Sequence, residues 1–190
     1  MTSEQDKSQA RGPIVLSIDA MGGDRGPATI VAGLAAFAQR NKQANFILHG
    51  PADQLTQLVE KRKLGKRVEI RDAQGVVSME DKPSHVMRNG QDTSMWSTLD
   101  SVRNGEATVA VSCGNTGALM LLSMVRLRKL PGVNRPAISV LWPSKNPQGF
   151  NVMLDVGADI RADADDLLKY ALMGASYARN GLSLERPRVG

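Results

Sequence analysis

The sequence predicts an α/β fold with a mostly parallel sheet, and three observations carry this prediction. Strand-like runs alternate with segments of helical apolar spacing. Glycine-containing turns follow three of these runs, in "IDAMGGD", "VSCGNTGAL" and "MLDVGAD". Hydrophobic residues make up 42% of the 190 residues, which is enough to form the core of one domain. Because strands and helices alternate, we expect parallel strands joined by right-handed crossovers.

The elements of the first part follow from local patterns. They are expected to be, in order, a strand at 14–19, a helix at 27–40, a strand at 45–49, a helix at 52–62 and a strand at 68–72. Pro27 supports the start of the first helix, because proline suits the first helical turn. Residues 73–90 are rich in polar and turn-forming types and are expected to form a long irregular region.

The second part continues with further helices and a β-hairpin. Its expected elements are a helix at 94–104, a strand at 108–112, a helix at 116–129, hairpin strands at 137–142 and 150–155, and a helix at 165–180. Residues 1–12 form a polar tail that we expect to be disordered. The final residues "RPRVG" resemble the start of another strand. We therefore expect residues 13–190 to be the N-terminal part of a single domain whose C-terminal part is absent.

Composition limits the classes of function. The formal net charge of +5 would suit an acidic partner, but lysine and arginine form no long run. Aromatic residues make up only 4%, so no nucleic-acid partner is expected. A single cysteine and an N-terminus without an apolar signal segment favour the cytoplasm. The longest apolar stretch, 118–125, is too short to span a bilayer.

Three glycine turns at strand ends are candidate ligand sites, because loops and helix N-termini converge there in an open parallel sheet. A phosphate suits such turns, since glycine lets the backbone approach closely and helix N–H groups attract anions. The candidate residues are Asp19, Gly22, Gly23, Asp24, Gly114, Asn115, Thr116, Gly117, Asp155 and Gly157. Lys82 and Arg88 could supply positive charge, although an exposed, solvated side chain is the default interpretation for both.

Other chemistries fit the sequence less well. The turns match neither G-x-G-x-x-G nor the P-loop, and no zinc or calcium spacing is present, so no metal is expected. Asp24 is expected to act first as a helix cap, whereas Asp19 and Asp155 are left undecided between ligand binding and capping. Cys113 has no histidine nearby in sequence, so buried packing is favoured over a nucleophilic role. His49 and His85 are interpreted as structural.

Several longer motifs occur together in one order: "IDAMGGD", "SCGNTGALM", "LPGVNRPAISVLWP", "MLDVGAD", "LMGASYAR" and "ERPRVG". This series resembles the PlsX family of phosphate acyltransferases. The resemblance implies a three-layer α/β/α Rossmann-like fold of the isopropylmalate-dehydrogenase-like superfamily and a homodimer without cofactors. It also implies transfer of a fatty acyl group from acyl carrier protein to inorganic phosphate in phospholipid synthesis. The expected location is cytoplasmic and peripherally membrane-associated, where the product feeds glycerol-3-phosphate acyltransferase.

Roles for individual residues follow from this resemblance. Asn115, Thr116 and Lys82 become catalytic candidates, and Ser94, in "RNGQDTSMW", joins the substrate-binding candidates. A docking face for the acidic carrier protein could include cations near the end of the 116–129 helix, although a solvated helix end explains them slightly better. These cations are Arg126, Arg128, Lys129 and Arg135. Two alternatives stay open: an NAD-dependent dehydrogenase of the isopropylmalate or isocitrate type, and an inactive fragment that only binds a partner.

Overall fold

The computed structural model describes residues 14–133, 136–156 and 162–190. The chain divides into two compact units, Met1–Arg128 and Lys129–Gly190. The expected tail at 1–12 lies outside the described residues. No helix in the three described ranges is long and apolar enough to cross a membrane.

The first unit contains a four-stranded parallel sheet, which confirms the predicted crossover topology. Its strands are β1 (Val15–Asp19), β2 (Asn45–Gly50), β3 (Val68–Asp72) and β4 (Val109–Val111), in the spatial order β3-β2-β1-β4. Ile18 on β1 pairs with Leu48 on one side and with Val111 on the other. The chain thus moves outward from β1 through β2 to β3 and then returns to add β4 on the opposite side of β1.

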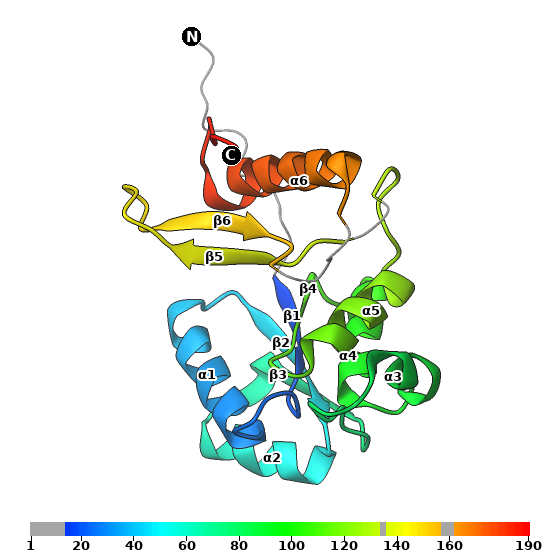
Figure 1. Cartoon of the computed structure of the whole chain (residues 1–190). Helices are drawn as coiled ribbons and strands as arrows, with labels where there is room; N and C mark the ends of the chain where they lie inside the picture. Colours follow the sequence, from blue (N-terminus) through cyan, green and yellow to red (C-terminus); the bar gives the residue numbers. More distant parts are fainter. Residues whose placement is uncertain (1–13, 134–135, 157–161) are drawn as a thin grey trace. The chain divides into compact units, whose positions relative to one another are not determined.

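Helices cover both faces of this sheet and complete the predicted three-layer fold (Figure 1). One face carries α1 (Pro27–Arg40) and α2 (Ala52–Lys61), and the other carries α3 (Pro83–Asn89), α4 (Ser94–Arg103) and α5 (Thr116–Arg126). Two apolar cores separate the layers. The first core packs β1 and β2 against α1 and α2 through Ile18, Val31, Leu34, Phe46, Leu48 and Leu55. The second joins α3, α4 and α5 through Val86, Met95, Trp96, Leu99, Ala118 and Leu122.

The strands place apolar side chains on one face of the sheet and polar side chains on the other, because successive side chains point to opposite faces. Ile18 and Leu48 enter the apolar core, whereas Ser17 and His49 are fully buried toward α4. The His49 ring bonds Ser17 Oγ through Nε2 at 2.8 Å and Ser97 Oγ through Nδ1 at 2.8 Å. Burial, followed by the nearby Arg71 charge, lowers the pKa of His49 to about 4. His49 is therefore a neutral, hydrogen-bonded structural residue at neutral pH.

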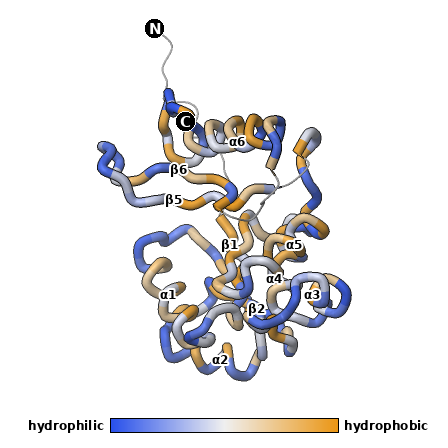
Figure 2. The backbone as a smooth tube through the Cα atoms, in the orientation of Figure 1, coloured by the Kyte–Doolittle hydropathy of each residue, from blue (hydrophilic) through white to orange (hydrophobic). Residues whose placement is uncertain are grey.

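The second unit consists of a hairpin and a long helix. Strands β5 (Ser139–Pro143) and β6 (Phe150–Leu154) pair antiparallel, as predicted. The helix α6 (Ala164–Leu182) packs against β6, where a Cβ added to Gly174 would lie 2.9 Å from Leu154 Cδ1. Figure 2 shows hydrophobic and hydrophilic positions mixed along α6.

One expected region differs clearly from the structure. Residues 73–90 are not irregular throughout, because Pro83–Asn89 forms the short helix α3. Pro83 sets the φ angle for the first turn, and Val86 is buried in the second core. A helix of seven residues makes less than two full turns, so the spacing of its apolar residues is too short to show helical periodicity.

Candidate active site

The turns after β1 and β4 lie at the point where the strand order reverses. In open α/β sheets, ligands bind beyond the carboxyl ends of the strands at such a switch point. Ile18 and Val111 are paired in register, so the chain leaves both strands at the same edge of the sheet. The first two predicted glycine turns are therefore neighbours in space, as expected.

The carboxylate of Asp19 joins three segments at this edge. Its Oδ1 accepts hydrogen bonds from the N–H groups of Met21 at 3.2 Å and Gly22 at 3.1 Å, and from Ser94 Oγ at 2.6 Å. Its Oδ2 accepts a bond from Ser112 Oγ at 2.7 Å. Four donors compensate the cost of burying the carboxylate, which is only 2% exposed. Asp19 thereby ties the β1 turn to the start of α4 and to the β4 turn.

The two glycine turns are packed so closely that a side chain would not fit between them. A Cβ on Gly22 would lie 2.7 Å from Asp19 Oδ2, 2.7 Å from Ser112 Oγ and 2.8 Å from the Gly114 nitrogen. A Cβ on Gly114 would lie 3.2 Å from Gly22 Cα. Gly23 has a φ of 107° and faces Cys113. Contact thus requires glycine at Gly22, backbone conformation favours it at Gly23, and the space at Gly114 is tight.

Asn115 is buried at the start of α5, and its side chain bonds protein groups at both ends. Its Oδ1 caps α5 by accepting from Ala118 N at 3.0 Å. Its Nδ2 donates to the carbonyl oxygens of Ser78 at 3.1 Å, Met79 at 3.2 Å and Asp81 at 2.9 Å. The side-chain amide therefore joins the 78–81 segment to α5.

The first turn of α5 presents backbone donors beside these glycines. Thr116 and Gly117 occupy the first two helical positions, where N–H groups have no intrahelical acceptor. The positive end of the helix dipole adds to their attraction for an anion. A Cβ on Gly117 would lie 3.0 Å from Pro83 Cγ, so the starts of α3 and α5 abut. Lys82 is exposed and directly precedes Pro83, next to this junction.

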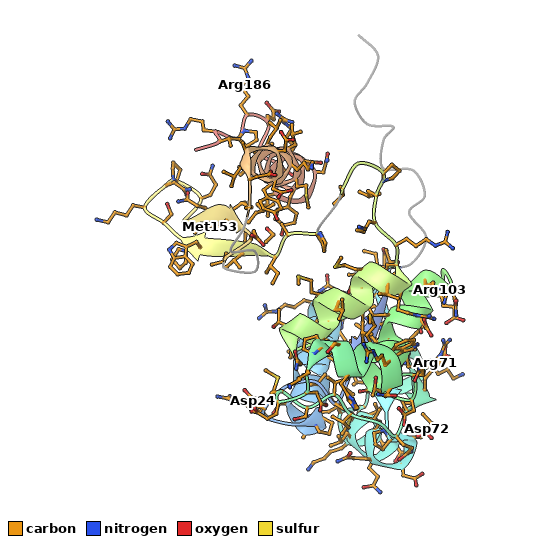
Figure 3. The ribbon with its side chains drawn as sticks, turned by 45° about the vertical axis from the view of Figure 1, so that its right-hand side comes forward. Asp24, Arg71, Asp72, Arg103, Met153 and Arg186 are labelled. Atoms are coloured by element: carbon orange, nitrogen blue, oxygen red, sulfur yellow. The ribbon has the colours of Figure 1, made fainter. Side chains whose placement is uncertain are left out.

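Two expected roles in these turns are wrong. The N-cap of α1 is Gly26, with no side-chain hydrogen bond, so Asp24 does not cap the helix. Asp24 is exposed and lies at the edge of the first unit (Figure 3). Cys113 is exposed rather than buried. Val109 and Val111, the β4 residues of the same alternation as Cys113, are exposed as well, and Cys113 lies in the turn after β4.

The remaining candidates are placed as follows. Asp155 belongs to the second unit and has a φ of 57°, and Gly157 lies outside the described residues. Arg126 stacks on Trp96, with its guanidinium carbon 4.7 Å from the ring centroid, and its Nε donates to Asp100 Oδ1 at 2.8 Å. This pairing reduces its availability for docking an acidic protein.

The other suggested cations fall into different places. Arg88 and Arg128 are exposed in the first unit, whereas Lys129 belongs to the second unit. Arg135 lies outside the described residues. No group of three or more His, Cys, Asp or Glu side chains in the described part of the chain could hold a metal ion.

Two contributors to this site were not predicted from the sequence. Ser112 bridges Asp19 and the Gly114 N–H, which donates to Ser112 Oγ at 3.1 Å. A serine between a strand and a glycine turn was the only available signal for this role. The 78–81 segment contacts Asn115 more than 30 residues further along the chain. No local pattern could predict that contact.

Comparisons with known proteins agree with the resemblance in the motifs. Residues 14–190 match the model of a family described as "Fatty acid synthesis protein". A protein named Phosphate acyltransferase from Paracoccus denitrificans is 68% identical over 196 residues, covering 100% of this chain and 53% of that protein. One from Ruegeria pomeroyi is 68% identical over 192 residues, covering 100% of this chain and 52% of that protein. One from Cereibacter sphaeroides is 71% identical over 180 residues, covering 94% of this chain and 49% of that protein.

These curated relatives are all named Phosphate acyltransferase, and each is longer than this chain. The chain spans about half the length of the curated relatives it matches. The family model, by contrast, covers the chain from the first strand to its last residue. The chain therefore belongs to the fatty acid synthesis protein family.

Proposed function

We propose that this chain is the phosphate-binding part of an enzyme that transfers a fatty acyl group from acyl carrier protein to inorganic phosphate. The observation that carries the proposal is the contact between the Gly22 and Gly114 turns beside the open first turn of α5. The name Phosphate acyltransferase, printed for relatives 68–71% identical to this chain, supports the same reaction. Acyl phosphate formed in this way would serve phospholipid synthesis.

The reaction needs positioning and charge stabilisation more than a protein nucleophile. A phosphate oxygen attacks the thioester carbonyl carbon, and the carbonyl oxygen becomes an oxyanion. The carbonyl then re-forms, the carbon–sulfur bond breaks, and the carrier leaves as a thiolate. Phosphate must therefore be held in line with the carbonyl, and donors must face the developing oxyanion. The exposed Cys113 has no part in this scheme.

The residues near the two turns divide this work between them. The N–H groups of Thr116 and Gly117 donate to phosphate or to the oxyanion, and the Thr116 hydroxyl adds a third donor. Gly22 and Gly23 let the backbone approach the anion, and Lys82 offsets its charge. One helix terminus contributes only about 0.3–1 kcal/mol toward a charge, so these groups must act together.

The structural partners of the other candidates suggest more indirect roles. Asp19 accepts a hydrogen bond from Ser94, so both residues support the turns rather than contact substrate. Asn115 can offer its backbone N–H to the anion, because its side chain is already hydrogen-bonded. Substrate contacts by Asp24, Gly114, Asp155 and Gly157 stay predictions.

The proposed partners and location rest on the family resemblance. Acyl carrier protein is acidic, and Arg128 is the first-unit cation that could meet it without breaking the Arg126–Asp100 pair. A homodimer in the cytoplasm, associated peripherally with the membrane near glycerol-3-phosphate acyltransferase, completes the proposal.

Phosphate-dependent loss of the acyl thioester tests the proposed function. The assay compares this chain with the full-length protein, using acyl carrier protein as donor and detecting acyl phosphate with hydroxylamine. We expect phosphate-dependent product from the full-length protein. Its absence there would refute the reaction, whereas activity in the full-length protein alone would identify this chain as an inactive fragment. Calorimetry with NAD, for which we expect no binding, tests the dehydrogenase alternative.

A further inference from the structure

The segment directly before Lys82 forms a compact turn with its own hydrogen bonds. Ser78 N donates to Asp81 Oδ2 at 2.8 Å, Asp81 N donates to Ser78 O at 3.2 Å, and Glu80 N donates to Ser78 Oγ at 3.2 Å. Met79 at the tip of the turn is 51% exposed, so packing alone holds the turn weakly. Its position on the protein is set by the buried Val77 that precedes it and by contacts made by its backbone carbonyls.

Asn115 supplies those contacts through a single amide group. Its Nδ2 has two hydrogens and lies within 3.2 Å of three carbonyl oxygens, those of Ser78, Met79 and Asp81. The side chain is only 8% exposed, so these hydrogen bonds are shielded from water. The opposite end of the amide, Oδ1, is fixed by capping α5. The Asn115 side chain thus fixes the position of the 78–81 turn relative to the first turn of α5.

Lys82 follows this turn immediately and is bounded on both sides. On one side the Asp81 carbonyl bonds Asn115, and on the other Pro83 packs against Gly117. Both contacts are made with the start of α5, where the proposed anion donors lie. The backbone from which the Lys82 side chain extends is therefore placed next to those donors by the same residue that caps their helix.

We propose that Asn115 is a positioning residue that fixes Lys82 beside the anion bound at the start of α5. The inference rests on the proposed function. It assigns the Asn115 side chain no contact with substrate. Loss of its Nδ2 should release the 78–81 turn, widen the range of positions open to Lys82 and weaken phosphate binding more than the chemical step.

Two substitutions at this position separate the turn contact from the helix cap. Asn115→Ser keeps a good N-cap residue but cannot reach three carbonyls. Asn115→Asp also keeps the cap and the size, but it directs a carboxylate oxygen at those carbonyls. With either variant, we expect faster hydrogen exchange of residues 76–82, while exchange in the first turn of α5, whose cap is kept, changes much less.

A double-mutant cycle in the full-length protein then tests whether Asn115 acts through Lys82. We expect Asn115→Ser and Lys82→Met each to raise the KM for inorganic phosphate about tenfold, with a change in kcat below about threefold. The KM of the double variant should lie within about twofold of the KM of the more impaired single variant. The exposed Lys66, far from this turn in sequence, gives the control: Lys66→Met should leave the Asn115→Ser effect unchanged.

The outcomes separate this inference from the proposed function. If the two effects multiply, or if exchange at 76–82 is unchanged, Asn115 does not act through Lys82 and the inference is overturned. If the unmutated full-length protein makes no acyl phosphate, the proposed function fails. The same cycle is then measured by NMR titration with inorganic phosphate, where non-additive losses of affinity support the inference. Multiplying losses, or no phosphate binding at all, overturn it.

Discussion

Replacing Gly22 with alanine tests how closely the two turns are packed. The added methyl group would lie 2.7–2.8 Å from three atoms, which is closer than a Cβ tolerates. Two of these atoms are Asp19 Oδ2 and Ser112 Oγ, which share a hydrogen bond, and the third is the backbone nitrogen of Gly114. Overpacking costs about 1–3 kcal/mol, and losing a hydrogen bond to a charged group adds about 1.5–3 kcal/mol. We therefore expect Gly22→Ala to lower the free energy of unfolding by about 2.5–6 kcal/mol.

The measurement is urea unfolding followed by fluorescence of Trp96. Trp142, which is 52% exposed in the second unit, is first replaced by phenylalanine so that only the first unit reports. Gly33→Ala serves as the matched control, because Gly33 lies in α1 with no atom within 4 Å of an added Cβ. Alanine there should stabilise the unit by about 0.5–1 kcal/mol. A loss below about 1 kcal/mol for Gly22→Ala would refute the close packing of the turns.

Three further predictions test neighbouring features. Asp19→Asn should destabilise the first unit by about 1.5–3 kcal/mol in the same urea assay, because it removes the charge from a buried acceptor of four hydrogen bonds. The pKa of His49 is about 4 when folded and 6.5 as the reference, so its neutral form contributes up to about 3 kcal/mol of stability above pH 6.5. Urea unfolding from pH 7 to pH 4 should show this contribution being lost as pH falls, and His49→Gln should flatten the profile whereas His85→Gln should not. Cys113 should react with Ellman's reagent in the folded protein, and excess phosphate should slow that reaction if the adjacent turns hold an anion.

The sequence predicts the fold well because the elements that build it have strong local signals. The parallel strands carry runs or alternations of β-branched and aliphatic residues, and Pro27 marks the start of a helix that begins at that residue. The Asn115 cap shows where local reasoning stops. Its position after a strand and before an apolar helix predicts capping or ligand contact equally well, and only the three carbonyls of a distant segment decide how its side chain is used.

Cys113 shows a second limit. A cysteine beside a β-rich run is usually buried, and that expectation is wrong here because the end of β4 is itself exposed, with Val111 38% exposed and Cys113 in the turn that follows. β4 lies at the end of the strand order and pairs with β1 through only three of its own residues. The partner is more than 90 residues away in sequence, so the exposure of Cys113 depends on tertiary structure.

The hydrogen bonds around Asp19 explain how the proposed anion site and a buried carboxylate can share the same edge of the sheet. A free negative charge near the glycine turns would repel phosphate, but both oxygens of Asp19 already accept bonds from four protein donors and face inward. The N–H groups of Thr116 and Gly117 lie instead at the start of α5, where no intrahelical acceptor uses them. The carboxylate thus fixes the turns while separate donors remain for the anion. Phosphate affinity should therefore depend on Asp19 only through the geometry of the turns, which is why the charge-neutral Asp19→Asn variant should weaken phosphate binding rather than strengthen it.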